Sequence, residues 1–296
     1  MEPSLQSPLF TRQVVQAMRS LYPEELADRA WDNVGLLQEN INPTSGSVPP
    51  RVLLTNDLTL AVAEEAILKK ASVIVSYHPF IFRGLKSITL NDPHQRIVLR
   101  LARHNIAVYS PHTAVDAVPG GINDWLADIL AQHATLTKRT VAQPIRGGPV
   151  PAGFEGAGYG RLVELDQPRE FATLAGWYAD ELGMSSVMVA RPRRPPGTMI
   201  RTVAVCAGSG YDVLKDVDAD LYVTGEMTHH NALRLTMLGK HVLTVFHSNS
   251  ERGFLRDVLR GQLEGALSAE VPGVEVLVSE EDGDPFEIWT PTQGSG

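Results

Sequence analysis

RVLLTNDLTLAVAEEAILKKASVIVSYHP, residues 51–79, is the stretch on which the fold prediction depends. It contains two short apolar runs, and between them lies a segment whose apolar residues recur at helical intervals. Such runs are typical of buried strands, and the segment between them is typical of a helix. A strand, a helix and a second strand in this order predict a parallel α/β unit.

The same alternation continues along the rest of the chain. Helical segments include PHQRIVLRLARHN (93–105) and GINDWLADILAQH (121–133), and apolar runs include IRTVAVC (200–206) and HVLTVFH (241–247). We therefore expect an α/β fold of two interlocked three-layer α/β/α domains. The first is expected over residues 1–140 and the second over 160–296, with some elements exchanged between them. Residues 141–159, rich in glycine and proline, are expected to be the linker.

Composition excludes several classes of protein. The 34 Asp and Glu outnumber the 26 Lys and Arg, and the net charge of −8 disfavours binding to a phosphate backbone. The single cysteine cannot form an intramolecular disulfide, and no apolar run approaches the roughly 20 residues that span a bilayer. The N-terminus has no signal-peptide pattern. We expect a cytoplasmic protein, with the nucleus and the mitochondrion as alternatives.

The two halves of the chain resemble degenerate copies of one unit. Alignment of residues 51–78 with 201–226 places His78 opposite Glu226, each at the end of an apolar run. The next run ends in His112 in the first copy and His247 in the second. Asp116 and Glu251 follow these histidines, so the spacing His-x-x-x-carboxylate occurs twice. The sequence thus repeats its polar residues together with its apolar pattern.

These polar residues predict a metal site. The carboxyl ends of parallel strands are where open α/β sheets bind ligands, and imidazole with carboxylate suits zinc, manganese, iron or nickel. The alternative is that each histidine or acid caps a strand or helix. Capping is the commoner explanation for one such residue alone, but four polar strand ends in register favour metal ligation.

Five blocks of sequence carry a resemblance to a known family. They are WDNVGLL (31–37), SYHPFIF (76–82), SPHTAVDAVPGGINDWLA (110–127), VTGEMTHHNAL (223–233) and FHSNSERGFL (246–255). Together they resemble the dinuclear-metal family of Ngg-one-interacting factor three, in the wording of its eukaryotic branch. Bacterial members are often labelled GTP cyclohydrolase 1 type 2.

The resemblance implies a site and an assembly. Members of the family hold two divalent ions in a cleft between two intertwined α/β domains, and they commonly form toroidal hexamers. The pattern implies that His78, Asp116, His247 and Glu251 are metal ligands, with Glu251 bridging. Bacterial members typically carry a His-His pair where this chain has Tyr77 and His78. Because phenol is a poor ligand, one metal site is expected to be weak, empty or completed by His112, so we expect one or two ions per chain.

Three further residues are candidates for catalysis. Glu226 is predicted to act as general base or to orient a ligand imidazole, with helix capping as the alternative. His230, beside His229, is a candidate proton donor or part of a surface histidine pair, and His112 is the third candidate. Asp32, Asn33 and Asp57 suit turns as well as substrate contacts. The glycine-containing segment 206–210 is interpreted as a tight turn rather than a phosphate loop.

Two functions follow from these residues and the resemblance. The first is a metal-dependent hydrolase, similar to GTP cyclohydrolase type 2, that acts on a small nucleotide-like or heterocyclic substrate. The second is a non-catalytic metal-binding protein that binds protein partners in transcriptional regulation, as the family name suggests. In either case we expect a homo-oligomer, by resemblance a hexamer.

Overall fold

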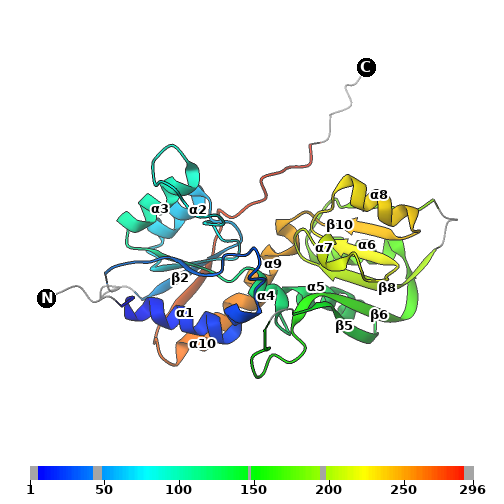
Figure 1. Cartoon of the computed structure of the whole chain (residues 1–296), viewed down its shortest axis with the longest axis horizontal. Coiled ribbons are helices and arrows are strands. Elements are labelled where there is room, and N and C mark those ends of the chain that lie inside the picture. The colour runs from blue at the N-terminus through cyan, green and yellow to red at the C-terminus, as the bar shows by residue number, and fades with distance from the viewer. Residues whose placement is uncertain (1–5, 43–48, 146–147, 194–197, 290–296) are drawn as a thin grey trace, which may run out of the picture.

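The computed structural model describes residues 6–42, 49–145, 148–193 and 198–289. It contains two β-sheets that lie side by side along the long axis of the molecule, with helices on both faces of each sheet (Figure 1). The predicted α/β fold with two three-layer halves is therefore confirmed. Within the described residues, every helix is too short or too polar to cross a bilayer.

The first sheet has five strands in the order β1-β4-β3-β2-β11. Its strands are β1 (Gly35–Gln38), β4 (Ala107–Ser110), β3 (Val73–Ser76), β2 (Arg51–Thr55) and β11 (Glu275–Val278). All neighbours run parallel except β1, which is antiparallel to β4. One face carries α2 (Leu60–Leu68) and α3 (Pro93–Arg103), and the other carries α1 (Leu9–Leu21) and α10 (Arg260–Ser268).

Alternation along these strands supplies both layers of the core. Leu53 and Ile74 point to the side of α2 and α3, while Leu54 and Val75 belong to the core that includes α1 and α10. The central strands β2, β3 and β4 are buried on both faces, which explains why they appear in the sequence as continuous apolar runs.

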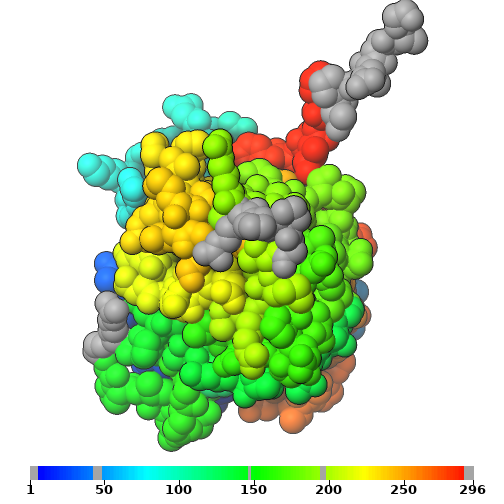
Figure 2. Space-filling view, turned by 90° about the vertical axis from the view of Figure 1, so that its right-hand side faces the viewer, coloured from blue at the N-terminus to red at the C-terminus, as the bar shows by residue number. Residues whose placement is uncertain are grey.

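The second sheet has six strands in the order β5-β6-β8-β9-β10-β7. They are β5 (Leu136–Pro144), β6 (Gly158–Glu170), β8 (Met199–Cys206), β9 (Leu221–Thr224), β10 (His241–Thr244) and β7 (Met188–Ala190). Helices α5 (Ile122–His133) and α6 (Phe171–Glu181) pack on one face, and α7 (Tyr211–Leu214) and α8 (His229–Met237) on the other. Figure 2 views this half end-on, where green and yellow residues of the second sheet and its helices fill the surface.

The repeat seen in the sequence is present in the structure. The parallel strands β2, β3 and β4 of the first sheet correspond to β8, β9 and β10 of the second, and each trio lies in the same spatial order. Side chains from beyond the carboxyl ends of both trios line one shared cavity. This arrangement brings the polar residues of the two copies together.

The C-terminal segment returns to the first sheet. Strand β11 pairs with β2, and α10 packs against α1, so residues 260–278 lie with the first half of the chain (Figure 1). The stretch expected as a linker, 141–159, begins inside β5 and ends inside β6, and its residues 146–147 lie outside the described residues. Helices α4 (Thr113–Ala117) and α9 (Arg252–Phe254) lie between the two sheets (Figure 1). Short turns are the 3-10 turns Glu24–Leu26 and Ser248–Ser250 and the π-helical turn Leu255–Leu259.

Candidate metal centre

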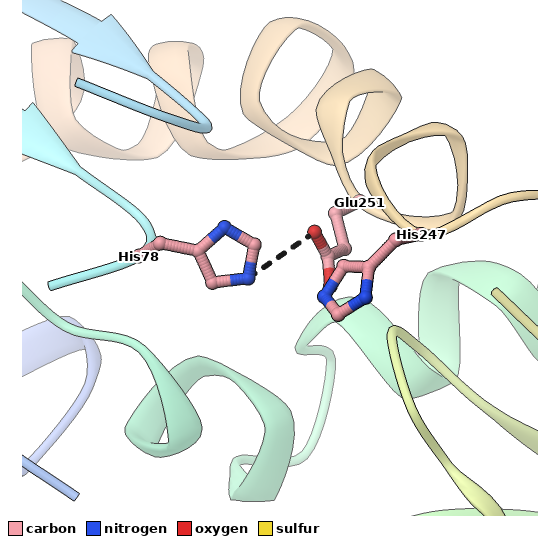
Figure 3. A group of neighbouring side chains, drawn as sticks. All are labelled: His78, His247 and Glu251. Carbon is pink, nitrogen blue, oxygen red and sulfur yellow. Dashed lines mark ion pairs between the residues drawn. The ribbon is translucent and has the colours of Figure 1, made fainter. Parts of the chain in front are cut away.

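Three predicted ligands meet between the two sheets. His78 follows β3, while His247 and Glu251 follow β10, and each offers a ligand atom within 4.8 Å of the others (Figure 3). His78 Nε2 lies 3.6 Å from Glu251 Oε2, and His247 Nε2 lies 3.4 Å from Glu251 Oε1. Two ligand atoms that each lie about 2.1 Å from a tetrahedrally coordinated ion are about 3.4 Å apart. The donor types and their spacing therefore fit a divalent ion.

A carboxylate stands behind each of the two imidazoles. Asp57 Oδ1 lies 3.0 Å from His78 Nδ1, and Glu226 Oε1 lies 3.0 Å from His247 Nδ1. Burial would raise the pKa of Asp57, but the hydrogen bond and charge of His78 outweigh it and lower that pKa. Hydrogen bonds from Ser209 and His247 likewise lower the pKa of Glu226, against the effect of partial burial. Such carboxylates orient a histidine so that Nε2 faces the ion.

Glu251 lies at the centre of the site and is 1% exposed. The Asn56 side-chain amide donates to its Oε2 at 3.0 Å and also to Asp57 Oδ2 at 3.1 Å. Burial raises the pKa of Glu251 well above its ordinary value, and the bond from Asn56 offsets this only in part. A buried carboxylate in this state gains most from a cation placed against it.

Unusual backbone conformations shape the loop that carries His247 and the loop that faces it. Phe246, just before His247, has φ +61°, and Gly208 in the facing loop has φ +59°. A left-handed conformation costs a bulky residue about 1–3 kcal/mol, so the fold around Phe246 must enforce it. A Cβ atom on Gly208 would lie 2.8 Å from Glu251 Oε1 and 3.1 Å from His247 Nε2. Gly208 is therefore needed for space beside the ligands.

The fourth predicted ligand, Asp116, accepts a hydrogen bond from Tyr77. Tyr77 is 2% exposed, and its hydroxyl donates to Asp116 Oδ1 at 2.6 Å. Burial and the charge of Asp116 raise the pKa of Tyr77 well above its ordinary value, so the phenol keeps its proton. Burial also raises the pKa of Asp116, against the effects of His112 and Tyr77. In the described residues Asp116 lies outside the compact group of three ligands.

His112 lies beside this group, with its own carboxylate. Its Nδ1 is 2.6 Å from Asp32 Oδ1, and Asp32 also accepts from the Thr113 amide and hydroxyl. Burial would raise the pKa of Asp32, but the hydrogen bond and charge of His112, with the bond from Thr113, lower it. His112 has φ +34°, and its ring centroid lies 5.3 Å from that of His78. The Asp32–His112 pair resembles the orienting arrangement found behind catalytic histidines.

A cavity of about 690 Å³ opens onto these residues. Five of the predicted residues line it, namely His78, His112, Asp116, His247 and Glu251. Glu226 is not among the lining residues but contacts His247, which is. His230 is the second residue of α8, after His229; it is exposed and is not among the residues that line this cavity.

Comparisons with known proteins identify the family. The family profile described as Duf34/NIF3 (NGG1p interacting factor 3) matches residues 10–285. The chain belongs to the Duf34/NIF3 family. The NIF3 homolog of Schizosaccharomyces pombe is 45% identical over 92% of this chain and 95% of its own length. NGG1-interacting factor 3 of Saccharomyces cerevisiae is 38% identical over 93% of this chain and 96% of its own.

A solved structure shares the fold of this NIF3-family chain. The Bacillus cereus protein related to NIF3 aligns with a TM-score of 0.77 at 22% identity, over 94% of this chain and 98% of that chain. At this identity the likeness concerns the fold alone, which is the two-sheet architecture described above.

Sequence reasoning missed one residue of this candidate site and undervalued two. Asn56 had not been singled out, although it follows a strand in the same way as His78. Asp32 and Asp57 were open between turn and substrate contact, and both instead support a histidine. An acid or amide directly after an apolar run was the signal available. Its partner, however, lies 21 to 195 residues away in the chain.

Proposed function

We propose that this chain is a metal-dependent hydrolase that binds one divalent ion between His78, His247 and Glu251. The observation that supports it best is the pair of imidazole Nε2 atoms facing the two oxygens of a buried carboxylate at 3.6 and 3.4 Å. A bound divalent ion would supply Lewis acidity for attack by water at neutral pH. The donor set, two nitrogens and a carboxylate, suits zinc, manganese, iron or nickel.

Surrounding residues have distinct parts in this proposal. Asp57 and Glu226 orient the two ligand imidazoles, and Asn56 holds Glu251 between them. The Asp32 carboxylate accepts a hydrogen bond from Nδ1–H of His112. His112 Nε2 is then free to accept a proton from an attacking water. The proposed substrate is a small nucleotide-like or heterocyclic molecule that fits the cavity beside the ligands.

Tyr77 is the reason for proposing one ion rather than two. Its hydroxyl already uses Asp116 as acceptor, and a buried phenol that keeps its proton is a poor ligand. Replacement of Tyr77 by histidine should restore an imidazole next to Asp116 and add a second ion.

Metal content tests the site. Protein purified without chelator or nickel affinity should contain about one ion per chain by plasma mass spectrometry, and the His247→Ala/Glu251→Ala variant should contain none. Tyr77→His should raise the content toward two. Wild-type protein without metal would refute the proposal.

Turnover tests the chemistry. Metal-loaded protein should hydrolyse a member of a broad panel of nucleosides, nucleotides and heterocycles. His112→Gln should reduce that rate about 10²- to 10⁴-fold with unchanged metal content. The exposed His94, on α3, supplies the control His94→Gln, which should keep full activity.

A second candidate is a non-catalytic partner-binding protein. The bond between Tyr77 and Asp116, which occupies one predicted ligand, favours it, and so does the name of the Saccharomyces cerevisiae relative, NGG1-interacting factor 3. On this alternative the His247→Ala/Glu251→Ala variant should still fold and bind its partners. Assembly into a homo-oligomer, proposed from the family resemblance, is tested by light scattering of the wild-type protein.

A further inference from the structure

Two aromatic side chains stand exposed in the wall of the cavity. Trp31 is 52% exposed and Phe82 is 45% exposed, and both line the cavity with the metal ligands. Their ring centroids are 5.9 Å apart with an interplanar angle of 49°. Trp31 also lies 5.7 Å from the His112 ring, edge to face. Large rings left exposed beside a polar site are typical of a surface that stacks on a ligand.

Hydrogen bonds between the two loops hold this pair in place. The backbone carbonyl of Asp28 accepts hydrogen bonds from the amides of Trp31 and Asp32. The side chain of Asp32 in turn orients His112. The next residue, Asn33, donates its side-chain amide to the carbonyl of Ile81, directly before Phe82. The Trp31 loop, the Phe82 loop and the His112 side chain are thus connected, so the aromatic pair has a defined position relative to the metal ligands.

The charge of the cavity restricts what stacks there. The acidic and basic residues of its lining other than histidine are five acids and one lysine: Asp28, Asp116, Asp212, Asp216, Glu251 and Lys215. The Lys215 ammonium forms an ion pair with Asp212 at 3.0 Å. Asp28, Asp212 and Asp216, which are not candidate ligands, outnumber Lys215, so the wall beside the ligands is negative. Such a lining repels a triphosphate and favours neutral or positive ligands.

We propose that Trp31 and Phe82 form a stacking subsite for an uncharged or cationic aromatic heterocycle of the nucleobase or nucleoside class. The subsite discriminates against nucleoside triphosphates. This inference rests on the proposed function, because it places the ring beside the ion held by His78, His247 and Glu251. It replaces the triphosphate suggested by the family label with a substrate that matches the charge of this cavity.

Binding to the metal-loaded full chain tests the subsite without any need for turnover. Guanosine and adenosine should bind by calorimetry and quench tryptophan fluorescence, and GTP and ATP should bind at least tenfold more weakly. Trp31→Ala should weaken nucleoside binding about 10- to 100-fold, as expected for the loss of a stacking ring, with unchanged metal content. Phe82→Ala should weaken it less. Trp289→Ala removes a ring that is 76% exposed and outside the cavity, and it should change nothing.

Each other result has a definite meaning. The proposal is overturned if the triphosphates bind more tightly than the nucleosides, if neither binds, or if Trp31→Ala binds like wild type. Nucleosides that bind through Trp31, with no member of the substrate panel hydrolysed, would support the subsite and refute the hydrolase. Hydrolysis that Trp31→Ala leaves unchanged would support the hydrolase and refute the subsite.

Discussion

Asp124 and Glu251 are both buried carboxylates, 8% and 1% exposed, but their surroundings differ. Asp124, on α5, accepts two bonds from the buried Arg161 guanidinium, at 2.8 and 2.7 Å. Burial would raise the pKa of Asp124, but the bonds and charge of Arg161 outweigh it and lower that pKa. Glu251 faces two imidazoles and an amide, and its pKa is raised.

The difference separates a structural ion pair from a candidate binding site. The Arg161 guanidinium donates to both oxygens of the Asp124 carboxylate, which is the geometry of a bidentate ion pair. Glu251 is surrounded by groups that ligate a metal, and no arginine or lysine donates to it among the described hydrogen bonds. A buried acid with ligands around it and a raised pKa is therefore more informative about function than a buried acid alone.

The largest expected effect comes from breaking the Arg161–Asp124 pair. Asp124→Ala leaves a buried guanidinium without its partner and should lower the free energy of unfolding by about 3–5 kcal/mol. Chemical denaturation measures it. Asp128→Ala, which removes a 54% exposed partner of Arg139, is the control and should cost less than about 1 kcal/mol. Equal losses in the two variants would contradict the structural role of Asp124.

A methyl group at Gly208 should damage the Glu251 region specifically. Gly208→Ala places a Cβ 2.8 Å from Glu251 Oε1, in a residue with φ +59°, so metal binding should be lost along with about 1–2 kcal/mol of stability. Gly273→Ala is the matched control, because Gly273 has φ +76° and open space around it. That variant should lose similar stability but keep its metal. Metal content and denaturation together separate the two effects.

Removal of the charge behind His247 should have a smaller effect. Glu226→Gln leaves the ligands in place but weakens the orientation of His247, so metal affinity should fall about 10- to 100-fold in competition with a chelator. Glu181→Gln changes the same kind of pair, between Glu181 and His133, away from the cavity. Metal affinity should then be unchanged. A fall of the same size in both variants would exclude a specific role for Glu226.

Lowering the pH should reduce the difference in unfolding free energy between the wild type and Asp124→Asn. The folded pKa of Asp124 is lowered, so its contribution to stability is present above its unfolded pKa of about 4 and is lost as pH falls through the folded value. The gap in unfolding free energy should be constant from pH 7 to 5 and should shrink below pH 4. A difference in unfolding free energy that grows as the pH falls would contradict the lowered pKa of Asp124.

Much of the fold could be predicted because its signals are local. The runs that became β2, β3 and β4, and their copies β8, β9 and β10, are short, apolar and separated by helical segments. Strand β11 could be recognised as a strand, but its pairing with β2 could not be read from the sequence, because the pairing joins residues more than 200 positions apart. The same distance effect hid Asn56, whose amide bonds to Glu251.

The sequence by itself determined the layered α/β architecture, the internal repeat and the polar residues at the ends of the strands. It also supplied Tyr77 next to the predicted ligand His78, since residue type and spacing are local properties of the chain. Only the tertiary structure decided which of these groups meet. It placed Tyr77 on Asp116, a carboxylate behind each of three histidines, and Trp31 and Phe82 in the cavity wall. The physical reason is that hydrogen bonds, burial and ligand spacing depend on distances between elements that only packing sets.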